Sequence, residues 1–190
     1  MNWLDIEKKR FDFTVAAIEQ KELIQVGNLI LNVRIDRIDV LENGQSIIID
    51  YKTNRQSIQT LIGDCPDEPQ LPLYLVMANS HQQTVGIAFA IVKAGAFGFV
   101  GILQDLDLLP DVKAYSQLTG CKHFGSWREL IATWQQQLIA LAEGFSSGDA
   151  RVNPKSYPAT CQQCDMQLIC RISQRLNVDS FTESKNENDG

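Results

Sequence analysis

The chain has 190 residues, of which 44% are hydrophobic and 21% charged, a composition typical of a globular domain and unlike that of disordered or collagen-like chains. No apolar run approaches the ~20 residues of a membrane-spanning helix, and the start MNWLDIEKKR is too charged for a secretory signal. We therefore expect a soluble, cytoplasmic domain with no membrane partner. The net charge of −6 does not argue against a nucleic-acid partner, because half of it lies in the last twelve residues.

The first half of the chain predicts a short helix followed by several strands. Residues 1–10 favour the helix, and alternating apolar residues from Phe11 predict a strand to about Glu19 that stays extended to Val26. Asn43-Gly44, between apolar runs over 29–41 and 45–53, is a strong hairpin signal. The run Ile47 to Ile49 predicts a central strand that is buried on both faces.

The second half predicts two helices and two further strands. A helix is expected from Glu68 to about Asn79, and strands over 85–92 and 97–103. Ser126 is a good N-cap for a long helix. The apolar stripe of that helix is predicted to pack in the core: Trp127, Leu130, Ile131, Trp134, Leu138, Leu141 and Phe145. This mixed order predicts an α/β or α+β protein.

Two aspartates and a lysine on the predicted hairpin have the chemistry of a metal site. Asp50 and Lys52 are two residues apart on one strand and therefore share a face, and Asp36 lies on the preceding strand. A carboxylate pair holds a divalent cation such as Mg²⁺, and a neighbouring lysine orients water and stabilises charge on a phosphate. The alternative is an ordinary ion-pair network with Arg34, Arg37 and Asp39.

The length of the hairpin loop tests this hypothesis. A two-residue Asn-Gly loop would place Asp36 opposite Tyr51, on the wrong face of the sheet. A three-residue loop over 42–44, with Gly44 in the left-handed region, would place Asp36 opposite Asp50. The proposed chemistry therefore predicts the longer loop.

Three motifs together resemble a known family. RIDRID followed by IIIDYKT is similar to the nuclease signature of the PD-(D/E)xK superfamily, in its RecB/AddB/Cas4-like branch. In QLPLY, Gln70 and Tyr74 have the Q-x3-Y spacing of that branch, and CQQCDMQLIC resembles the C-x2-C-x5-C of AddB-type members. The resemblance covers roughly residues 29–172 and is closest to the C-terminal nuclease domain of AddB-type helicase–nuclease subunits.

The resemblance implies a restriction-endonuclease-like α/β fold, with a mixed central β-sheet flanked by helices, and a metal-dependent DNA exonuclease. It implies that Asp36, Asp50 and the Tyr51 carbonyl bind Mg²⁺ or Mn²⁺ and that Lys52 assists the attacking water. Gln70 and Tyr74 would position DNA or the carboxylates. DNA and a helicase domain or subunit would be the partners, in DNA repair or recombination. The upstream acidic or His ligand of the family has no clear counterpart, and Glu19 is a weak candidate.

Three cysteines near the C-terminus are expected to bind a metal. Cys161, Cys164 and Cys170 supply soft thiolate ligands that suit zinc or an iron–sulfur cluster. The resemblance favours a [4Fe-4S] cluster, with a fourth ligand outside this chain. Neither Cys65 nor Cys121 matches the family position.

The implied organisation has three parts. A nuclease core spans residues 1–160 and lacks the family's N-terminal helix, a cysteine segment spans 161–175, and a disordered acidic tail spans 176–190. This predicts that the chain is the C-terminal part of a longer protein, or a shortened descendant of one.

Two other functions are compatible with the sequence. The chain could be a catalytically inactive DNA-binding or scaffolding module of the same fold, or a zinc-binding interaction domain whose hairpin charges are structural. Two sets of charged residues lie outside these motifs. A basic group beside the cysteines could contact DNA: Arg151, Lys155, Arg171 and Arg175. A second set is expected only to be solvated at the surface: His81, Asp105, Asp107 and Asp111.

Overall fold

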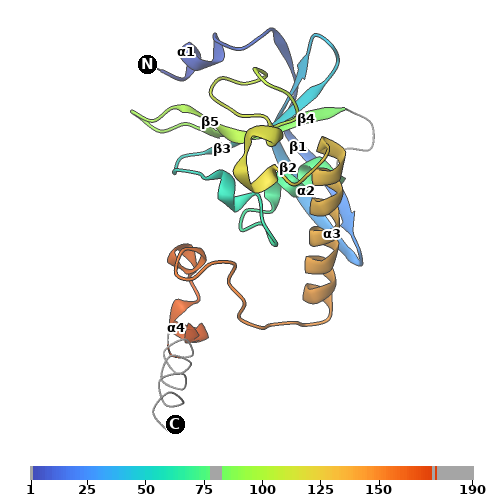
Figure 1. Cartoon of the computed structure of the whole chain (residues 1–190), viewed down its shortest axis with the longest axis vertical. Coiled ribbons are helices and arrows are strands. Elements are labelled where there is room, and N and C mark those ends of the chain that lie inside the picture. Colours follow the sequence, from blue (N-terminus) through green and yellow to red (C-terminus); the bar gives the residue numbers. More distant parts are fainter. Residues whose placement is uncertain (1, 78–82, 173, 175–190) are drawn as a thin grey trace. The chain divides into compact units, whose positions relative to one another are not determined.

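A five-stranded mixed sheet forms the centre of the computed structural model, which describes residues 2–77, 83–172 and 174 (Figure 1). The strands are β1 (Phe13–Val26), β2 (Leu29–Leu41), β3 (Ser46–Lys52), β4 (Thr84–Ile91) and β5 (Gly98–Leu103). They lie in sequence order, and only the β3–β4 pair is parallel. The helices are α1 (Trp3–Glu7), α2 (Gln70–Met77), α3 (Trp127–Ser146) and α4 (Gln167–Cys170). The predicted α/β class is confirmed.

The loop between β2 and β3 has the three-residue form that the metal-site hypothesis requires. Leu41 donates its N–H to the Gln45 carbonyl at 2.8 Å, which leaves residues 42–44 as the loop. Gly44 has φ +80°, a conformation that glycine adopts without steric cost. The pairs Arg37 with Ile49 and Ile38 with Ile48 follow. Continued by one residue, this register places Asp36 opposite Asp50, as predicted.

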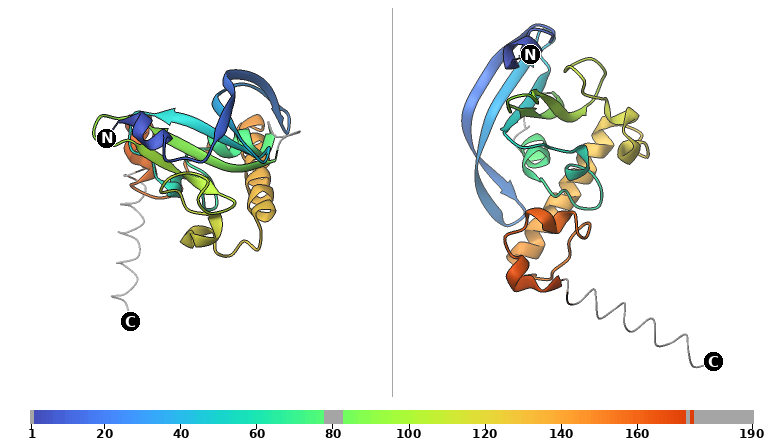
Figure 2. Two further views of the ribbon diagram at one scale, coloured as in Figure 1. Left: turned by 90° about the horizontal axis from the view of Figure 1, so that it is seen from above. Right: turned by 90° about the vertical axis from the view of Figure 1, so that its left-hand side faces the viewer.

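The β1–β2 hairpin is longer than the rest of the sheet and bends along its length (Figure 2). The predicted first strand and its extension form one strand, β1, rather than two segments. Its register with β2 shifts between Val15 and Ala17, and Glu19 has φ +53° inside the strand. The bulge and the left-handed residue explain why a single strand has an interrupted apolar pattern.

Each face of the sheet packs against its own hydrophobic core. On one face, Ile48 and Phe89 pack with α2 and α3. On the other face, Ile47 and Ile49 pack with Ile6 of α1 and with the segment after β5. Ile47 and Ile49 are 0% exposed, which confirms the predicted central strand.

Helix α3 begins where its N-cap predicts, because the Ser126 side chain accepts the N–H of Glu129 at 3.1 Å. Most of its apolar stripe is buried, but Leu141 and Phe145 are 48% and 77% exposed. Their predicted place in the core is wrong. Ala142 already lies at the Gly27 turn where the hairpin ends, so the last helical turn extends past the sheet.

A buried ion network joins α1 to the sheet. Arg37 donates to Asp39 at 2.6 and 2.9 Å and to Glu7 at 2.8 Å. Arg10 pairs with Asp39 at 2.7 Å and with Glu7 at 2.8 Å. The Tyr51 hydroxyl accepts from Arg37 at 2.9 Å. This network lies on the α1 side, so Arg37 and Asp39 do not neutralise Asp50.

Residues 149–190 form a second compact unit, separate from residues 1–148. Its described part contains a 3-10 turn (Thr160–Gln163) and α4. His81, Arg175 and the predicted acidic tail lie outside the described residues. Within the described ranges, none of the helices combines the length and apolarity that crossing a membrane requires.

Candidate active site

The predicted catalytic residues come from β2, β3 and α2 and gather on one face of the sheet. Alternation along β3 turns Asp50 and Lys52 toward the α2 side and Tyr51 toward the α1 side. On β2, the Asp36 carboxylate accepts the main-chain N–H of Tyr51 at 2.9 Å. The hairpin therefore brings Asp36 to the strand that carries the other two residues.

Asp50 and Lys52 form a partly buried ion pair. Lys52 Nζ lies 2.9 Å from Asp50 Oδ2, and the two side chains are 24% and 2% exposed. Burial raises the pKa of Asp50, Lys52 opposes that rise, and the charges of Asp36 and Glu68 add to it. Burial by itself would lower the pKa of Lys52, but the carboxylates outweigh it and the pKa is raised. Lys52 is therefore an ammonium ion at neutral pH.

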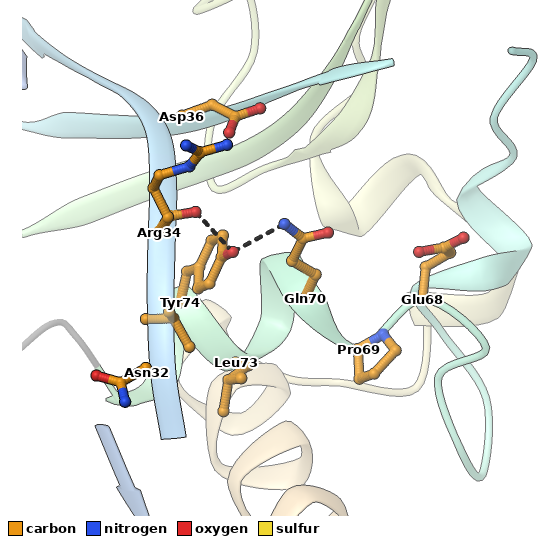
Figure 3. A pocket seen from close by; sticks show the side chains of 9 residues that line it. Asn32, Arg34, Asp36, Glu68, Pro69, Gln70, Leu73 and Tyr74 are labelled. Carbon is orange, nitrogen blue, oxygen red and sulfur yellow. Dashed lines mark hydrogen bonds between the residues drawn. The ribbon is translucent and has the colours of Figure 1, made fainter. Parts of the chain in front are cut away.

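Helix α2 connects this ion pair to β2 through a chain of hydrogen bonds, of which Figure 3 shows the part from Gln70 through Tyr74 to Arg34. Lys52 Nζ donates to Gln70 Oε1 at 3.2 Å, and Gln70 Nε2 donates to the Tyr74 hydroxyl at 2.8 Å. Tyr74 donates in turn to the Arg34 carbonyl at 2.9 Å. Gln70 and Tyr74 are one helical turn apart and share a face, as their spacing predicts. Pro69 precedes the helix and Pro72 lies in its first turn, so α2 begins two residues later than predicted.

A cavity of about 580 Å³ opens beside these residues (Figure 3). Asp36, Gln70 and Tyr74 line it together with Arg34 and Glu68, two residues that the sequence had not assigned to the site. Glu68 lies just before α2, where only the folded chain brings its charge near Asp50 and Lys52. Glu68 stands two residues before the QLPLY motif but is not part of it, so the motif did not identify it.

The donor set fits a hard divalent cation. Asp36 uses Oδ2 for the Tyr51 N–H, and its Oδ1 has no hydrogen-bond partner among the residues that the structure describes. Asp50 is a buried carboxylate whose charge is only partly compensated by Lys52. Oxygen ligands of this kind suit Mg²⁺ or Mn²⁺. No group of three or more His, Cys, Asp or Glu side chains that could hold a metal ion occurs in the described ranges.

Among the residues that the structure describes, the cysteines do not come together in a group of three or more that could hold a metal ion. Cys161 lies in the 3-10 turn, Cys164 follows that turn, and Cys170 ends α4. Cys65 is exposed. Cys121 is fully buried, and burial raises the pKa of its thiol to about 11. Such a thiol is a poor source of a thiolate ligand.

The remaining charged residues differ in whether they form an ion pair. Asp105, Asp107 and Asp111 are exposed, as predicted. Arg151, a member of the predicted basic group, is paired with Asp149 at 2.5 Å. That pairing reduces the charge that the group offers to a nucleic acid.

The sequence and the fold were compared with those of known proteins. The family described as the PD-(D/E)XK nuclease superfamily matches residues 1–171. No curated protein matches the sequence. A solved structure titled "Crystal structure of SSO0001" is 19% identical, covers 88% of this chain and has a TM-score of 0.43; the chain spans 64% of that protein's length. The family match covers most of the chain and agrees with a mixed, helix-flanked sheet of the restriction-endonuclease type, so the chain belongs to the PD-(D/E)XK nuclease superfamily.

Proposed function

We propose that this protein is a metal-dependent deoxyribonuclease that hydrolyses phosphodiester bonds at the Asp36–Asp50–Lys52 site. The observation that carries the proposal is the partly buried Asp50–Lys52 pair, which lies beside Asp36 because of the three-residue loop. A purely structural ion pair would not require this loop. Divalent metals such as Mg²⁺ typically serve the superfamily to which the chain belongs.

In this proposal Asp36, Asp50 and the Tyr51 carbonyl hold the metal. When bound, the metal supplies Lewis-acid activation of water and neutralises charge on the phosphate. Lys52, kept protonated by its carboxylate neighbours, orients the attacking water and stabilises the negative charge that develops on the phosphate. Gln70 holds the Lys52 ammonium group in place through its side-chain oxygen.

The finer assignments rest on the resemblance of the RIDRID, DYKT and QLPLY motifs. We propose DNA as the substrate, exonuclease-type cleavage, and a helicase domain or subunit as the source of the strand during repair or recombination. End-labelled linear DNA and circular single-stranded DNA of the same sequence distinguish the cleavage types. Degradation of the linear substrate alone would support an exonuclease, and cleavage of the circle would overturn that assignment.

The central experiment measures cleavage of labelled single- and double-stranded DNA with Mg²⁺ or Mn²⁺. We expect the native protein to cleave, and Asp50→Asn and Lys52→Ala to lose roughly a hundredfold or more of the rate, as for removal of other transition-state contacts. Asp105→Asn is the matched control, because it removes one carboxylate charge from an exposed loop. RNA of the same sequence is the control substrate.

The outcomes separate the three functional hypotheses. Cleavage that persists in both Asp50→Asn and Lys52→Ala would overturn the proposed site. Salt-sensitive DNA binding without any cleavage would support the inactive module instead. Neither cleavage nor DNA binding, in a protein that contains stoichiometric zinc, would support the interaction domain.

We also propose that Cys161, Cys164 and Cys170 supply three ligands of a [4Fe-4S] cluster, whose fourth ligand lies outside this chain. Three thiolates at this spacing favour a soft metal. A brown preparation under anaerobic conditions, with visible absorption that is lost in Cys164→Ser, would support the cluster. A colourless protein with stoichiometric zinc would overturn it.

A further inference from the structure

Arg34 is the only cation among the nine residues that line the cavity. Its side chain is 61% exposed. Asp36 and Glu68 give the same cavity negative charge, and the ammonium group of Lys52 is already paired with Asp50. A polyanionic strand that enters this cavity therefore meets one available positive group before it reaches the metal ligands.

The Arg34 guanidinium is held in place by Glu19 of the neighbouring strand. Arg34 Nε lies 2.8 Å from Glu19 Oε2. Ile18 pairs with Arg37 and Gln20 with Ile35, so Glu19 falls opposite Asp36. The 2.8 Å contact is made by Nε of the guanidinium. Within the described part of the chain, its two terminal nitrogens donate no hydrogen bond to a protein group.

The backbone of Glu19 is strained, and the ion pair that Glu19 makes with Arg34 adds little stability to the fold. A non-glycine residue with φ +53° costs about 1–2 kcal/mol. An exposed ion pair contributes only about 0–1 kcal/mol, and the Glu19 side chain is 53% exposed. Because the pair does not repay the strain, stability does not account for it. Strain of this kind typically fixes a side chain at a functional site.

The main chain of Arg34 is held by helix α2. Its carbonyl accepts the Tyr74 hydroxyl, which is joined through Gln70 to Lys52. Arg34 is therefore positioned twice, at its carbonyl by α2 and at its guanidinium by β1. Only the contact at the carbonyl connects Arg34 to the Asp50–Lys52 pair; the contact with Glu19 restrains the guanidinium itself.

We propose that Arg34, positioned by Glu19, binds a backbone phosphate of the substrate strand next to the phosphodiester to be cleaved. The inference rests on the proposed nuclease function and adds two residues to it. A guanidinium presents paired N–H donors that match two phosphate oxygens, and the terminal nitrogens of Arg34 are available for this contact. Glu19 is a positioning residue, because it acts on the substrate only through Arg34.

The test measures binding of a labelled single-stranded DNA oligonucleotide by fluorescence anisotropy in EDTA, at several salt concentrations. We expect Arg34→Ala to weaken binding roughly tenfold, the loss of one charged hydrogen-bonded contact. The slope of log affinity against log salt should fall by about 1. Lys21→Ala is the matched control. Lys21 is exposed and lies directly opposite Arg34 on β1, but it does not line the cavity.

Two further variants separate positioning from charge. Arg34→Lys keeps the charge without the paired donors and should restore the salt slope but only part of the affinity. Glu19→Gln should weaken binding less than Arg34→Ala, because the guanidinium is still present but less fixed. In cleavage assays both Arg34 variants should raise KM more than they lower kcat.

The result that overturns the inference differs from the one that overturns the proposed function. If the native protein cleaves DNA and Arg34→Ala has the same affinity and salt slope as Lys21→Ala, the phosphate contact is wrong and the nuclease stands. If the native protein neither binds nor cleaves DNA, both are wrong. Equal thermal unfolding midpoints for native protein and variants exclude loss of folding as the cause.

Discussion

The Asp36 carboxylate accepts the main-chain N–H of Tyr51 at 2.9 Å, one residue away from Asp50 on β3. This bond fixes one oxygen of Asp36 and extends the hairpin pairing beyond its last backbone pair, Arg37 with Ile49. The neighbouring Tyr51 hydroxyl accepts from Arg37 on the opposite face. Tyr51 thus links the proposed metal ligands to the buried ion network behind them.

The first prediction concerns the cost of keeping Asp50 charged. Its native pKa lies above the unfolded value of 3.8, chiefly because of burial. A group with a raised acidic pKa binds more protons in the native state, so stability falls as pH rises from the unfolded pKa through the native one. Above that window the penalty remains in full. We expect Asp50→Asn, in EDTA at pH 7, to unfold at a higher urea concentration than the native protein.

Mg²⁺ should act in the opposite direction on the same two proteins. A metal that binds only the native state at about 100 times its Kd adds about 2.7 kcal/mol of stability. The native protein should gain this shift, and Asp50→Asn should not. Asp105→Asn changes an exposed residue, so its urea midpoint should equal that of the native protein with and without metal. Equal urea midpoints for native protein and Asp50→Asn in EDTA would contradict the burial argument.

The second prediction concerns the hydroxyl of Tyr74. Tyr74→Phe leaves the Arg34 carbonyl and the Gln70 amide without their shared partner. We expect a loss of about 1 kcal/mol in the free energy of unfolding and a lower cleavage rate, because Gln70 also contacts Lys52. Tyr115→Phe is the control, since Tyr115 packs its ring against Trp127 away from the site. A rate unchanged by Tyr74→Phe would show that the chain of hydrogen bonds does not position Lys52.

The third prediction concerns the ion network under the sheet. Asp39 is 0% exposed and is paired with both Arg10 and Arg37. Asp39→Asn leaves two arginine charges with less compensation, which costs about 3 kcal/mol in a buried network. The change should show as a lower urea midpoint that depends little on salt. Asp149→Asn, which breaks the exposed pair with Arg151, should change the midpoint by less than about 0.5 kcal/mol.

The sequence allowed the central part of the site to be predicted because local rules determine it. Asn43-Gly44 marks the hairpin, and the metal-site hypothesis predicted the three-residue loop that sets Asp36 opposite Asp50. Helical spacing placed Gln70 and Tyr74 on one face. These inferences use contacts between residues close in sequence or joined by one turn. The structure brings the predicted residues together, while their roles in catalysis stay predictions.

The remaining features depend on contacts that no local pattern reveals. Glu19 contacts Arg34 only because the register of β1 shifts near Val15 and because Glu19 itself has a left-handed backbone conformation. Strand propensity disfavours that conformation. Glu68 belongs to the cavity through the tertiary placement of α2. Phe145 repeats the apolar spacing of α3 but lies in its last turn and is 77% exposed, so periodicity predicted burial where the described residues leave the side chain uncovered.

The last prediction tests the close packing of β4 against β5 with two glycines on one strand. A Cβ at Gly101 would lie 2.2 Å from the Ile87 carbonyl oxygen and 2.7 Å from Ala88 Cα, whereas a Cβ at Gly98 meets nothing within 4 Å. The Ile87 and Ala88 backbone belongs to β4, which is paired with both β3 and β5, and it cannot move aside without breaking these ladders. We expect Gly101→Ala to lower the free energy of unfolding by about 3 kcal/mol, as overpacking does, and Gly98→Ala to change it by less than about 0.5 kcal/mol. Urea denaturation of the two variants measures the difference. Equal midpoints would show that β4 and β5 leave room for a methyl group at residue 101.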